Sequence, residues 1–335
     1  MPLVGKGDEL DLSLALQNLI SAPVLFFCLG IAAAMVRSDL VVPEAVAKAL
    51  SLYLMLAIGF KGGVAATEYG LGADLLILIG AAALLSFVIP FISFGLLNAT
   101  TRLARVDAAA IAAHYGSISI VTFIAATTAI EAAGISYPGV MVAAAAAMEV
   151  PAIAAALLLA RKRGADPGTH AGHAGEAPWR EVMVNGSVVL LVGAFIVGGL
   201  TGKQGYEDVA PFISDPFKGV LCLFLLDMGL VAGRELRRIG KTLTPALLIF
   251  GLYMPPIGGV LGALTGAAIG LDTGGVALLS VLGASASYIA VPAAMRLALP
   301  EAKPSLYLTL SLAVTFPFNL TLGIPGYIAL AQWLT

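Results

Sequence analysis

Four serine residues in two apolar stretches are the residues of this chain best suited to hold a ligand. Ser117 and Ser119 lie in HYGSISIVT (114–122), and Ser285 and Ser287 lie in GASASY (283–288), in the same register 168 positions later (285 minus 117). A helix that breaks beside such hydroxyls exposes N–H groups whose partial positive charge attracts an anion. Matching polar interruptions in two halves of an apolar chain are typical of a transporter's binding site. We therefore predict a small-anion site at Gly116, Ser117, Ser119, Thr122, Ala284, Ser285, Ser287 and Tyr288.

A glutamate in the first half and two polar residues in the second are candidates for binding a cation. Glu149 lies in MEVP (148–151), inside an Ala-rich apolar stretch, where a carboxylate costs about 2.5–3.5 kcal/mol on insertion scales. Pro151 has no N–H, so the carbonyl of Ala147 loses its usual helical bond and becomes available to a hard cation such as Na⁺ or to a proton. By the same register, the second half adds oxygens at positions 315 and 319. We therefore predict a cation site at Glu149, Ala147, Thr315 and Asn319.

Each of these residues also has a purely structural interpretation. Buried serine hydroxyls often bond to a carbonyl of the preceding turn or join two helices. Glu149 can be protonated and satisfied by a simple hydrogen bond, and Asn319 can join helices. His114, one turn before the first serine pair, is either a packing residue or a proton relay.

The composition indicates an integral membrane protein. The chain is 59% hydrophobic and 11% charged, whereas a soluble domain is about a quarter charged. Its net charge of −2 gives no reason to expect nucleic-acid binding. The apolar stretches are unbroken over helical lengths, unlike the short alternating segments of a membrane β-barrel. No zinc-protease, P-loop or nucleophile-elbow motif is present, so we do not expect an enzyme or a resident cofactor.

The apolar stretches predict ten membrane-spanning helices, because a span needs about 20 residues. They lie at 18–36, 43–60, 74–97, 107–130, 137–160, 182–200, 217–233, 243–270, 274–299 and 304–333. A polar, Gly-rich linker at 164–180 divides the chain into a first repeat, 1–163, and a second, 181–335. Five spans per half reverse the direction of the second half, so homologous halves form an inverted repeat. Prolines are expected to break the fifth and tenth spans, at Pro151 and Pro317.

The positive charges predict the orientation. With ten spans, most of the 18 Lys and Arg residues fall on the side of the linker. Cytoplasmic loops carry an excess of these residues. We therefore expect the linker side to be cytoplasmic and both termini to lie outside.

Several segments resemble the sodium-dependent bicarbonate transporters of cyanobacteria and their bacterial relatives. The resemblance covers nearly the whole chain and includes VPEA (42–45), the break at 116–122, MEVP (148–151) and SAS (285–287). It implies an all-α protein of ten spans in inverted five-helix repeats, with a core domain and a gate domain. It also implies that broken helices at spans 4 and 9 cross near bound bicarbonate and Na⁺. A homotrimer in the bacterial inner membrane is the expected assembly.

The chain departs from that family at the site itself. Ile120 and Val121 stand where the cyanobacterial proteins have small or polar residues, Tyr288 stands in place of an aspartate, and Glu149 replaces an aspartate. The cyanobacterial transporters are inhibited by a small PII-type protein, a partner not expected here because the linker is short.

The functional expectation is a secondary transporter that takes up a small anion, bicarbonate by resemblance, coupled to sodium by alternating access. Two alternatives stay open. The first is a carrier for another small organic anion, or one coupled to protons, because Ile120 and Tyr288 change the pocket. The second is a membrane sensor that does not transport.

Overall fold

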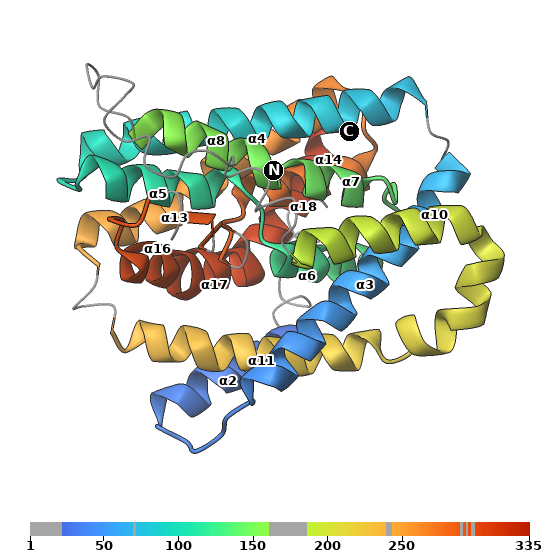
Figure 1. Ribbon diagram of the computed structural model, residues 1–335, viewed down its shortest axis with the longest axis horizontal. Coiled ribbons are helices and arrows are strands. Elements are labelled where there is room, and N and C mark those ends of the chain that lie inside the picture. The colour runs from blue at the N-terminus through green and yellow to red at the C-terminus, as the bar shows by residue number, and fades with distance from the viewer. Residues whose placement is uncertain are drawn as a thin grey trace, which may run out of the picture.

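The computed structural model is built from helices. It describes residues 22–69, 72–160, 186–238, 243–288, 291–292, 294–295 and 299–335, and within these ranges every regular element is helical (Figure 1). The predicted linker, 164–180, lies outside the described residues, as do residues 1–21 and much of the second half of the predicted ninth span. The all-α prediction is therefore confirmed for the described part of the chain.

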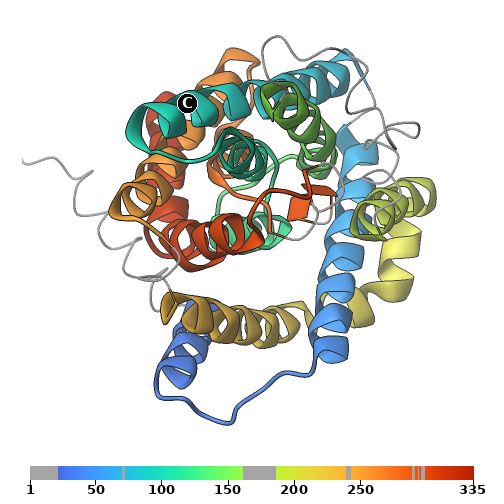
Figure 2. The ribbon, with the colours of Figure 1, turned by 60° about the vertical axis from the view of Figure 1, so that its left-hand side comes forward.

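Four helices form an outer group, and the remaining helices form an inner bundle beside it (Figures 1 and 2). The outer group consists of α2 (Ala22–Met35), α3 (Glu44–Tyr69), α10 (Gly186–Ile213) and α11 (Phe217–Leu236). The first half of the inner bundle consists of α4 (Ala73–Thr100), α5 (Arg105–Gly116), α6 (Ile120–Ala132), α7 (Met141–Ala147) and α8 (Glu149–Ala160). Its second half consists of α13 (Pro245–Ala268), α14 (Thr273–Ala284), α16 (Pro304–Leu310), η1 (Ser311–Thr315), α17 (Phe316–Phe318), η2 (Asn319–Gly323) and α18 (Ile324–Leu334).

Helix lengths identify a multi-pass membrane protein. Six apolar segments of the described chain are long enough to cross a membrane, or up to seven if α10 and α11, which are bent by 52° at their junction, count as one span. The six are Glu44–Thr67, Ala73–Thr100, Arg105–Ala132, Met141–Ala160, Pro245–Ala268 and Pro304–Leu334. Helices α2 and α14, which belong to the predicted first and ninth spans, are shorter. The count of ten stays a prediction.

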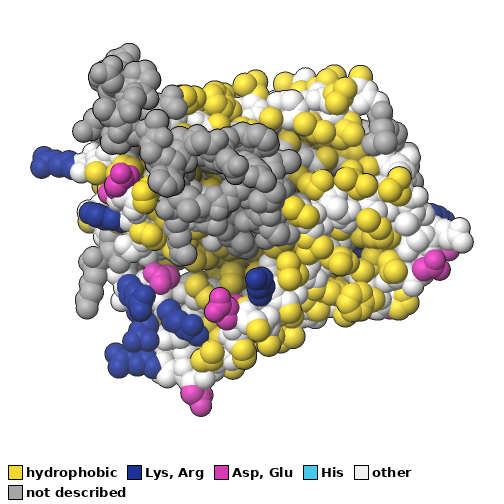
Figure 3. Space-filling view, viewed as in Figure 1, with side chains coloured by type: hydrophobic (Ala, Val, Ile, Leu, Met, Phe, Trp, Pro, Cys, Tyr) yellow, Lys and Arg dark blue, Asp and Glu magenta, His cyan; other side chains and the backbone are white. Residues whose placement is uncertain are grey.

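Charged and apolar side chains occupy different parts of the surface. Most of the Lys and Arg side chains visible in Figure 3 gather at one end of the molecule, and hydrophobic side chains cover its middle. In Figure 1 that end holds the last turns of α4 and α11 and the first turns of α5 and α16. On this face, most of the visible basic side chains thus lie at one end of the helices, and the predicted orientation in the membrane stays a prediction.

The outer group is held together by two close helix crossings. At four glycines an added Cβ would overlap a backbone carbonyl oxygen of the facing helix, so the helices approach more closely than larger residues would allow. On α2 and α11 these are Gly30 against Leu226 and Gly229 against Phe27; on α3 and α10 they are Gly63 against Phe195 and Gly198 against Phe60.

The inner bundle surrounds α5. All residues from Asp107 to Gly116 are buried, and the run of alanines allows α4 and α8 to pack closely on it. Polar groups brought in by α5 must therefore find their partners inside the bundle, because neither lipid nor bulk water reaches them.

The tenth predicted span corrects the expectation of a break at Pro317. The chain stays helical from Pro304 to Leu334, and wide π-type turns, η1 and η2, lie on either side of the proline. A proline removes a helical hydrogen bond and clashes with the preceding turn. The wide turns absorb this defect without interrupting the helix.

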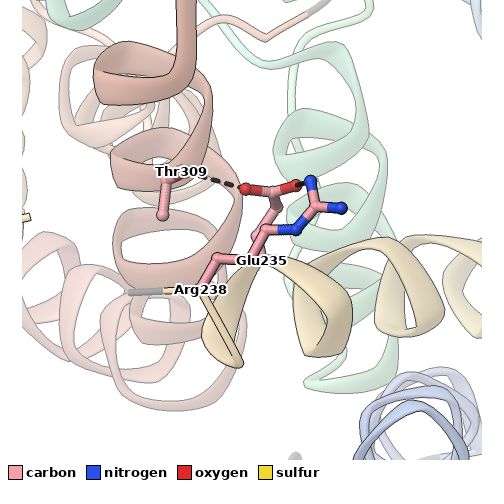
Figure 4. Close-up of polar contacts among 3 residues, drawn as sticks. All are labelled: Glu235, Arg238 and Thr309. Carbon is pink, nitrogen blue, oxygen red and sulfur yellow. Dashed lines mark hydrogen bonds and ion pairs between the residues drawn. The ribbon is translucent and has the colours of Figure 1, made fainter. Parts of the chain in front are cut away.

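One hydrogen bond joins the outer group to the inner bundle near the basic end (Figure 4). The Thr309 hydroxyl of α16 donates to Glu235 Oε2 of α11 at 2.8 Å. Arg238, one turn further along, lies 3.6 Å from the other carboxylate oxygen. Thr309 is fully buried and Glu235 is partly exposed, so this bond lies at the edge of the interface between the two groups.

Candidate functional site

The first break lies where the sequence predicted it. Helix α5 ends at Gly116, Ser117 is extended, and α6 starts at Ile120. Ser119 caps α6: its Oγ accepts hydrogen bonds from the Thr122 backbone N–H at 3.2 Å and from the Thr122 hydroxyl at 2.9 Å. Serine is a favoured N-cap because it satisfies an N–H that has no helical partner.

The second break begins at the other serine pair. Helix α14 ends at Ala284, and Ser285 is extended. The Ser285 hydroxyl donates to the Leu282 carbonyl at 2.9 Å, and Ser287 Oγ accepts a long bond from the Val291 N–H at 3.5 Å. The helix therefore ends where apolar residues give way to serines.

Two hydrogen bonds bring these breaks into direct contact. The Ser119 N–H donates to Ser285 Oγ at 3.0 Å, and the Ser287 N–H donates to the His114 carbonyl at 2.7 Å. We call the region formed by residues 114–122 and 283–288 the crossing. Residues 166 positions apart (285 minus 119) and 173 positions apart (287 minus 114) thus meet inside the inner bundle.

The hydrogen bonds divide the hydroxyls of the crossing into two kinds. The protons of Ser117 and Ser285 are used, since Ser117 donates to Glu149 and Ser285 to a backbone carbonyl. Ser119 and Ser287 only accept, and no bond that either hydroxyl donates is found among the described residues. The sequence did not distinguish these two kinds, because spacing does not show which proton is used.

Tyr288 adds a third available hydroxyl. Its ring packs edge-on against Phe316 with centroids 5.6 Å apart, and its Oη is buried without a hydrogen-bond partner. The Ser119 side chain lies close to this hydroxyl. A buried hydroxyl left unpaired costs about 1–3 kcal/mol, so a ligand that accepts from it would recover that cost.

Glu149 is linked directly to the first break. Its carboxylate is buried at the start of α8, and Oε2 accepts the Ser117 hydroxyl at 2.6 Å. The N-terminus of a helix favours negative charge. Helices α7 and α8 separate at Met148, so Pro151 lies in the first turn of α8, where a missing N–H is tolerated.

Serine 86 is a residue that the sequence reasoning missed. Its hydroxyl, on α4, donates to the Met148 carbonyl at 2.6 Å, between α7 and α8. Pro90, four residues later, removes the helical bond that the Ser86 carbonyl would accept. A serine four residues before a proline inside an apolar span was the available signal.

Thr315 and Asn319 are held by contacts that do not involve Glu149. The Thr315 hydroxyl donates to the Gly251 carbonyl at 3.0 Å and accepts from the Tyr115 hydroxyl at 2.6 Å. Asn319 Nδ2 donates to the Ala284 carbonyl at 2.8 Å, and its Oδ1 accepts from Tyr327 at 3.1 Å. Of the predicted cation-site residues, Glu149 therefore bonds to the first break, whereas Thr315 and Asn319 bond to other partners in the inner bundle.

Gly116 and Ala284 contribute backbone to the crossing. A Cβ on Gly116 would lie 2.6 Å from Pro90 Cδ and 2.8 Å from the Ser86 carbonyl oxygen, so only glycine lets α5 end this close to α4. The Ala284 carbonyl is the last of α14 and is capped by Asn319. Both residues shape the site without offering a side-chain ligand.

Comparison with protein families gives one match that covers nearly the whole chain. A family model described as the Na⁺-dependent bicarbonate transporter superfamily matches residues 22–332 of 335. The matched range contains both breaks and every helix of the outer group and the inner bundle, apart from the last two residues of α18. Among curated proteins, no relative matches the chain.

Proposed function

Because the chain belongs to the Na⁺-dependent bicarbonate transporter superfamily, we propose that it is a secondary transporter that takes up bicarbonate together with Na⁺ by alternating access. The observation that carries this proposal is the crossing, where two broken helices meet beside a buried carboxylate. Discontinuous helices that meet inside a bundle are the usual substrate sites of secondary transporters.

The available donors of the crossing suit a small anion. The hydroxyls of Ser119, Ser287 and Tyr288 are free to donate, and the N-terminus of α6 contributes its partial positive charge. The segments 114–122 and 283–288 contain no Lys or Arg. Neutral donors and helix dipoles bind a singly charged anion without the strong attraction that would prevent its release.

Glu149 provides a way to couple the anion to a cation. A Na⁺ ion or a proton at this carboxylate would cancel its charge, which otherwise repels an anion at the neighbouring crossing. The hydroxyl that Glu149 accepts belongs to Ser117 of the first break. Binding of a cation to the carboxylate would therefore affect the anion site directly through Ser117. Carbonyl oxygens near the α7–α8 junction, including that of Ala147, would complete the cation's ligands. Thr315 and Asn319 remain proposed contributors from the tenth span.

The two glycine crossings support an inverted repeat of residues 1–163 and 181–335, and hence ten spans. Gly30 and Gly198 are 168 positions apart, the same offset as that of the serine pairs, and so are their neighbours Phe27 and Phe195. Each of these glycines meets a carbonyl of the facing helix, and each phenylalanine carbonyl meets a facing glycine. On the partner helices the corresponding pairs, Gly63 with Gly229 and Phe60 with Leu226, are 166 positions apart (229 minus 63, 226 minus 60), so the two crossings have similar contacts in nearly the same register, which supports the proposal.

The division into two helix groups supports a gate and a core. In this proposal the outer group is the gate, the inner bundle is the core, and the core moves past the gate to expose the crossing on alternate sides. The Thr309–Glu235 hydrogen bond joins the two groups and would break during that movement. The basic end would face the cytoplasm and both termini the outside, in the inner membrane of a bacterium. Assembly as a homotrimer is part of the same proposal.

Uptake into proteoliposomes tests the proposal. Labelled bicarbonate uptake should be faster with an inward Na⁺ gradient than with equal Na⁺ on both sides, and Glu149→Gln should remove the difference. The double variant Ser119→Ala, Ser287→Ala should weaken apparent affinity, by about 2–10-fold per lost hydrogen bond. Ser280→Ala is the matched control, because Ser280 lies on α14 and bonds to the Gly259 carbonyl instead. Bicarbonate uptake that is the same with and without the Na⁺ gradient, or no faster than in vesicles without protein, would exclude Na⁺-coupled bicarbonate transport.

Tyr288 favours a second candidate, the transport of another small anion such as a carboxylate. Its buried hydroxyl adds a donor and its ring fills space at the crossing. Competition by acetate or formate against labelled bicarbonate separates the two candidates. If a carboxylate halves bicarbonate uptake at a concentration lower than the half-saturating concentration of bicarbonate, the carboxylate is the better substrate.

A further inference from the structure

His114 is a buried histidine whose second ring nitrogen is unused. Its side chain is fully buried in α5, and Nδ1 lies 2.6 Å from the Ala110 carbonyl oxygen. A carbonyl only accepts, so Nδ1 carries the proton and Nε2 of the neutral ring has a bare lone pair. Nε2 has no hydrogen-bond partner. A buried acceptor of this kind is a place where a proton can bind.

The facing helix presents a matching unused group. The His114 ring stacks on Tyr307 of α16, with centroids 4.3 Å apart and planes inclined by 26°. Tyr115 bonds to Thr315 of η1, two turns beyond Tyr307 along the tenth predicted span. Ser311 lies one turn from both Tyr307 and Thr315, so it belongs to the helix face that meets α5. Its hydroxyl is also buried and has no hydrogen-bond partner.

Two groups near His114 favour a positive charge on its ring, in opposition to the burial of the side chain, which disfavours one. The residue lies in the last turn of α5, where the helix carries a partial negative charge. Ser117, one turn later, holds the carboxylate of Glu149. Of the described elements packed on α5, α8 brings Glu149 to Ser117, α13 brings Tyr253 close to Tyr115, and α16 brings Tyr307 to His114. Helices α4 and α14 carry their acidic residues, Asp74 and Asp272, at their far N-terminal ends.

We propose that His114 is a proton-binding site coupled to the cation site at Glu149. A proton from water binds Nε2, while Nδ1–H keeps its bond to Ala110. The two side chains are not bonded to each other in this structure, so the imidazolium donates from Nε2 to Ser311 Oγ only after they move within hydrogen-bonding distance. The proton returns to water when the site empties. The His114 carbonyl accepts the Ser287 N–H, so a movement of His114 on protonation would be transmitted directly to the second break.

The coupling has a definite sign. A cation at Glu149 cancels the carboxylate that attracts the imidazolium, so Na⁺ makes protonation of His114 less favourable. Linkage requires the reverse as well: a proton on His114 weakens Na⁺ binding by the same factor. The inference rests on the proposed function for the cation that occupies Glu149, but the proton site itself does not depend on transport.

¹⁵N-histidine NMR of the full chain in nanodiscs tests the proposal. The chain has three histidines, and His170→Gln with His173→Gln leaves His114 as the only signal. We expect one titration of the ring, with a midpoint that moves to lower pH by about half a unit, a threefold loss of proton affinity, when saturating Na⁺ replaces choline. Glu149→Gln should remove this Na⁺ response. A ring that stays neutral at every pH at which the protein is folded would overturn the proposal.

A matched pair of serine variants tests the proton's partner. Ser311→Ala should move the His114 midpoint to lower pH, because the imidazolium loses its acceptor. Ser93→Ala should leave it unchanged, because the Ser93 hydroxyl is equally buried and unpartnered but lies on α4. Equal effects of the two variants would refute the assignment of Ser311. If His114 titrates as expected but vesicles take up no bicarbonate, the transport function fails and the proton site stands.

Discussion

Replacing Ser285 with alanine tests how the two breaks are held together. Ser285 Oγ accepts the Ser119 N–H at 3.0 Å and donates to the Leu282 carbonyl at 2.9 Å. The carbonyl loses little, since it keeps the Ser285 backbone N–H at 3.3 Å. The Ser119 N–H, in contrast, is left buried and unpaired, which costs about 1–3 kcal/mol. The arrangement of the crossing should therefore become about 5–150-fold less favourable relative to a separated one.

The measurement is the dissociation constant of bicarbonate for purified protein, together with the half-saturating concentration in vesicles. Both should rise within that range for Ser285→Ala. Ser280→Ala is the control, because Ser280 is equally buried on α14 and donates to the Gly259 carbonyl at 2.7 Å, away from the breaks. It should lower stability by about 0.5–1.5 kcal/mol and leave affinity unchanged. Unchanged affinity in Ser285→Ala, or an equal loss in both variants, would refute the idea that this bond orders the site.

Three further predictions concern packing and movement. Gly116→Ala should destabilise the protein by about 1–3 kcal/mol in thermal unfolding, since its Cβ overlaps α4, whereas Gly95→Ala, which meets open space, should not. Asn319→Ala should cost about 1–3 kcal/mol in the same assay, because it leaves a buried tyrosine hydroxyl without its acceptor, and a loss near zero would contradict the assigned bonds. Thr309→Val removes the hydrogen bond to Glu235 and should shift the equilibrium between the two positions of the core relative to the gate by about 1–2 kcal/mol. Spin-label distances between α11 and α16 would report this shift. Unchanged transport by the variant would argue against a bond that breaks in each transport cycle.

The helix breaks could be predicted because they depend on local chemistry. Ser119 interrupts an apolar run and caps the N-terminus of α6, and Ser285 interrupts the other apolar run at the C-terminus of α14. Backbone groups inside a membrane must be satisfied within the protein, so a polar interruption there marks a break. The link between Glu149 and the first break was within reach of the same argument, since a buried carboxylate needs a partner.

The partners of the polar groups could not be predicted, because they depend on the rotation of helices about their axes. Ser86 reaches Met148, and Asn319 reaches Ala284, across distances in sequence that no local pattern encodes. The result at Pro317 was also open to two outcomes, since a lost helical bond produces either a break or a wide turn.

By itself, the sequence determined that this chain is helical, lies in a membrane and carries paired polar breaks. A bilayer requires long apolar helices with satisfied backbone groups whatever their tertiary contacts, so composition and the spacing of polar residues are enough to predict these features. Tertiary structure decided which hydroxyls remain free. Ser117 and Ser285 use their protons on neighbours, whereas Ser119, Ser287 and Tyr288 keep theirs. That distinction depends on where facing helices place carbonyls and carboxylates, and hydrogen bonds form only within about 3 Å and with suitable direction.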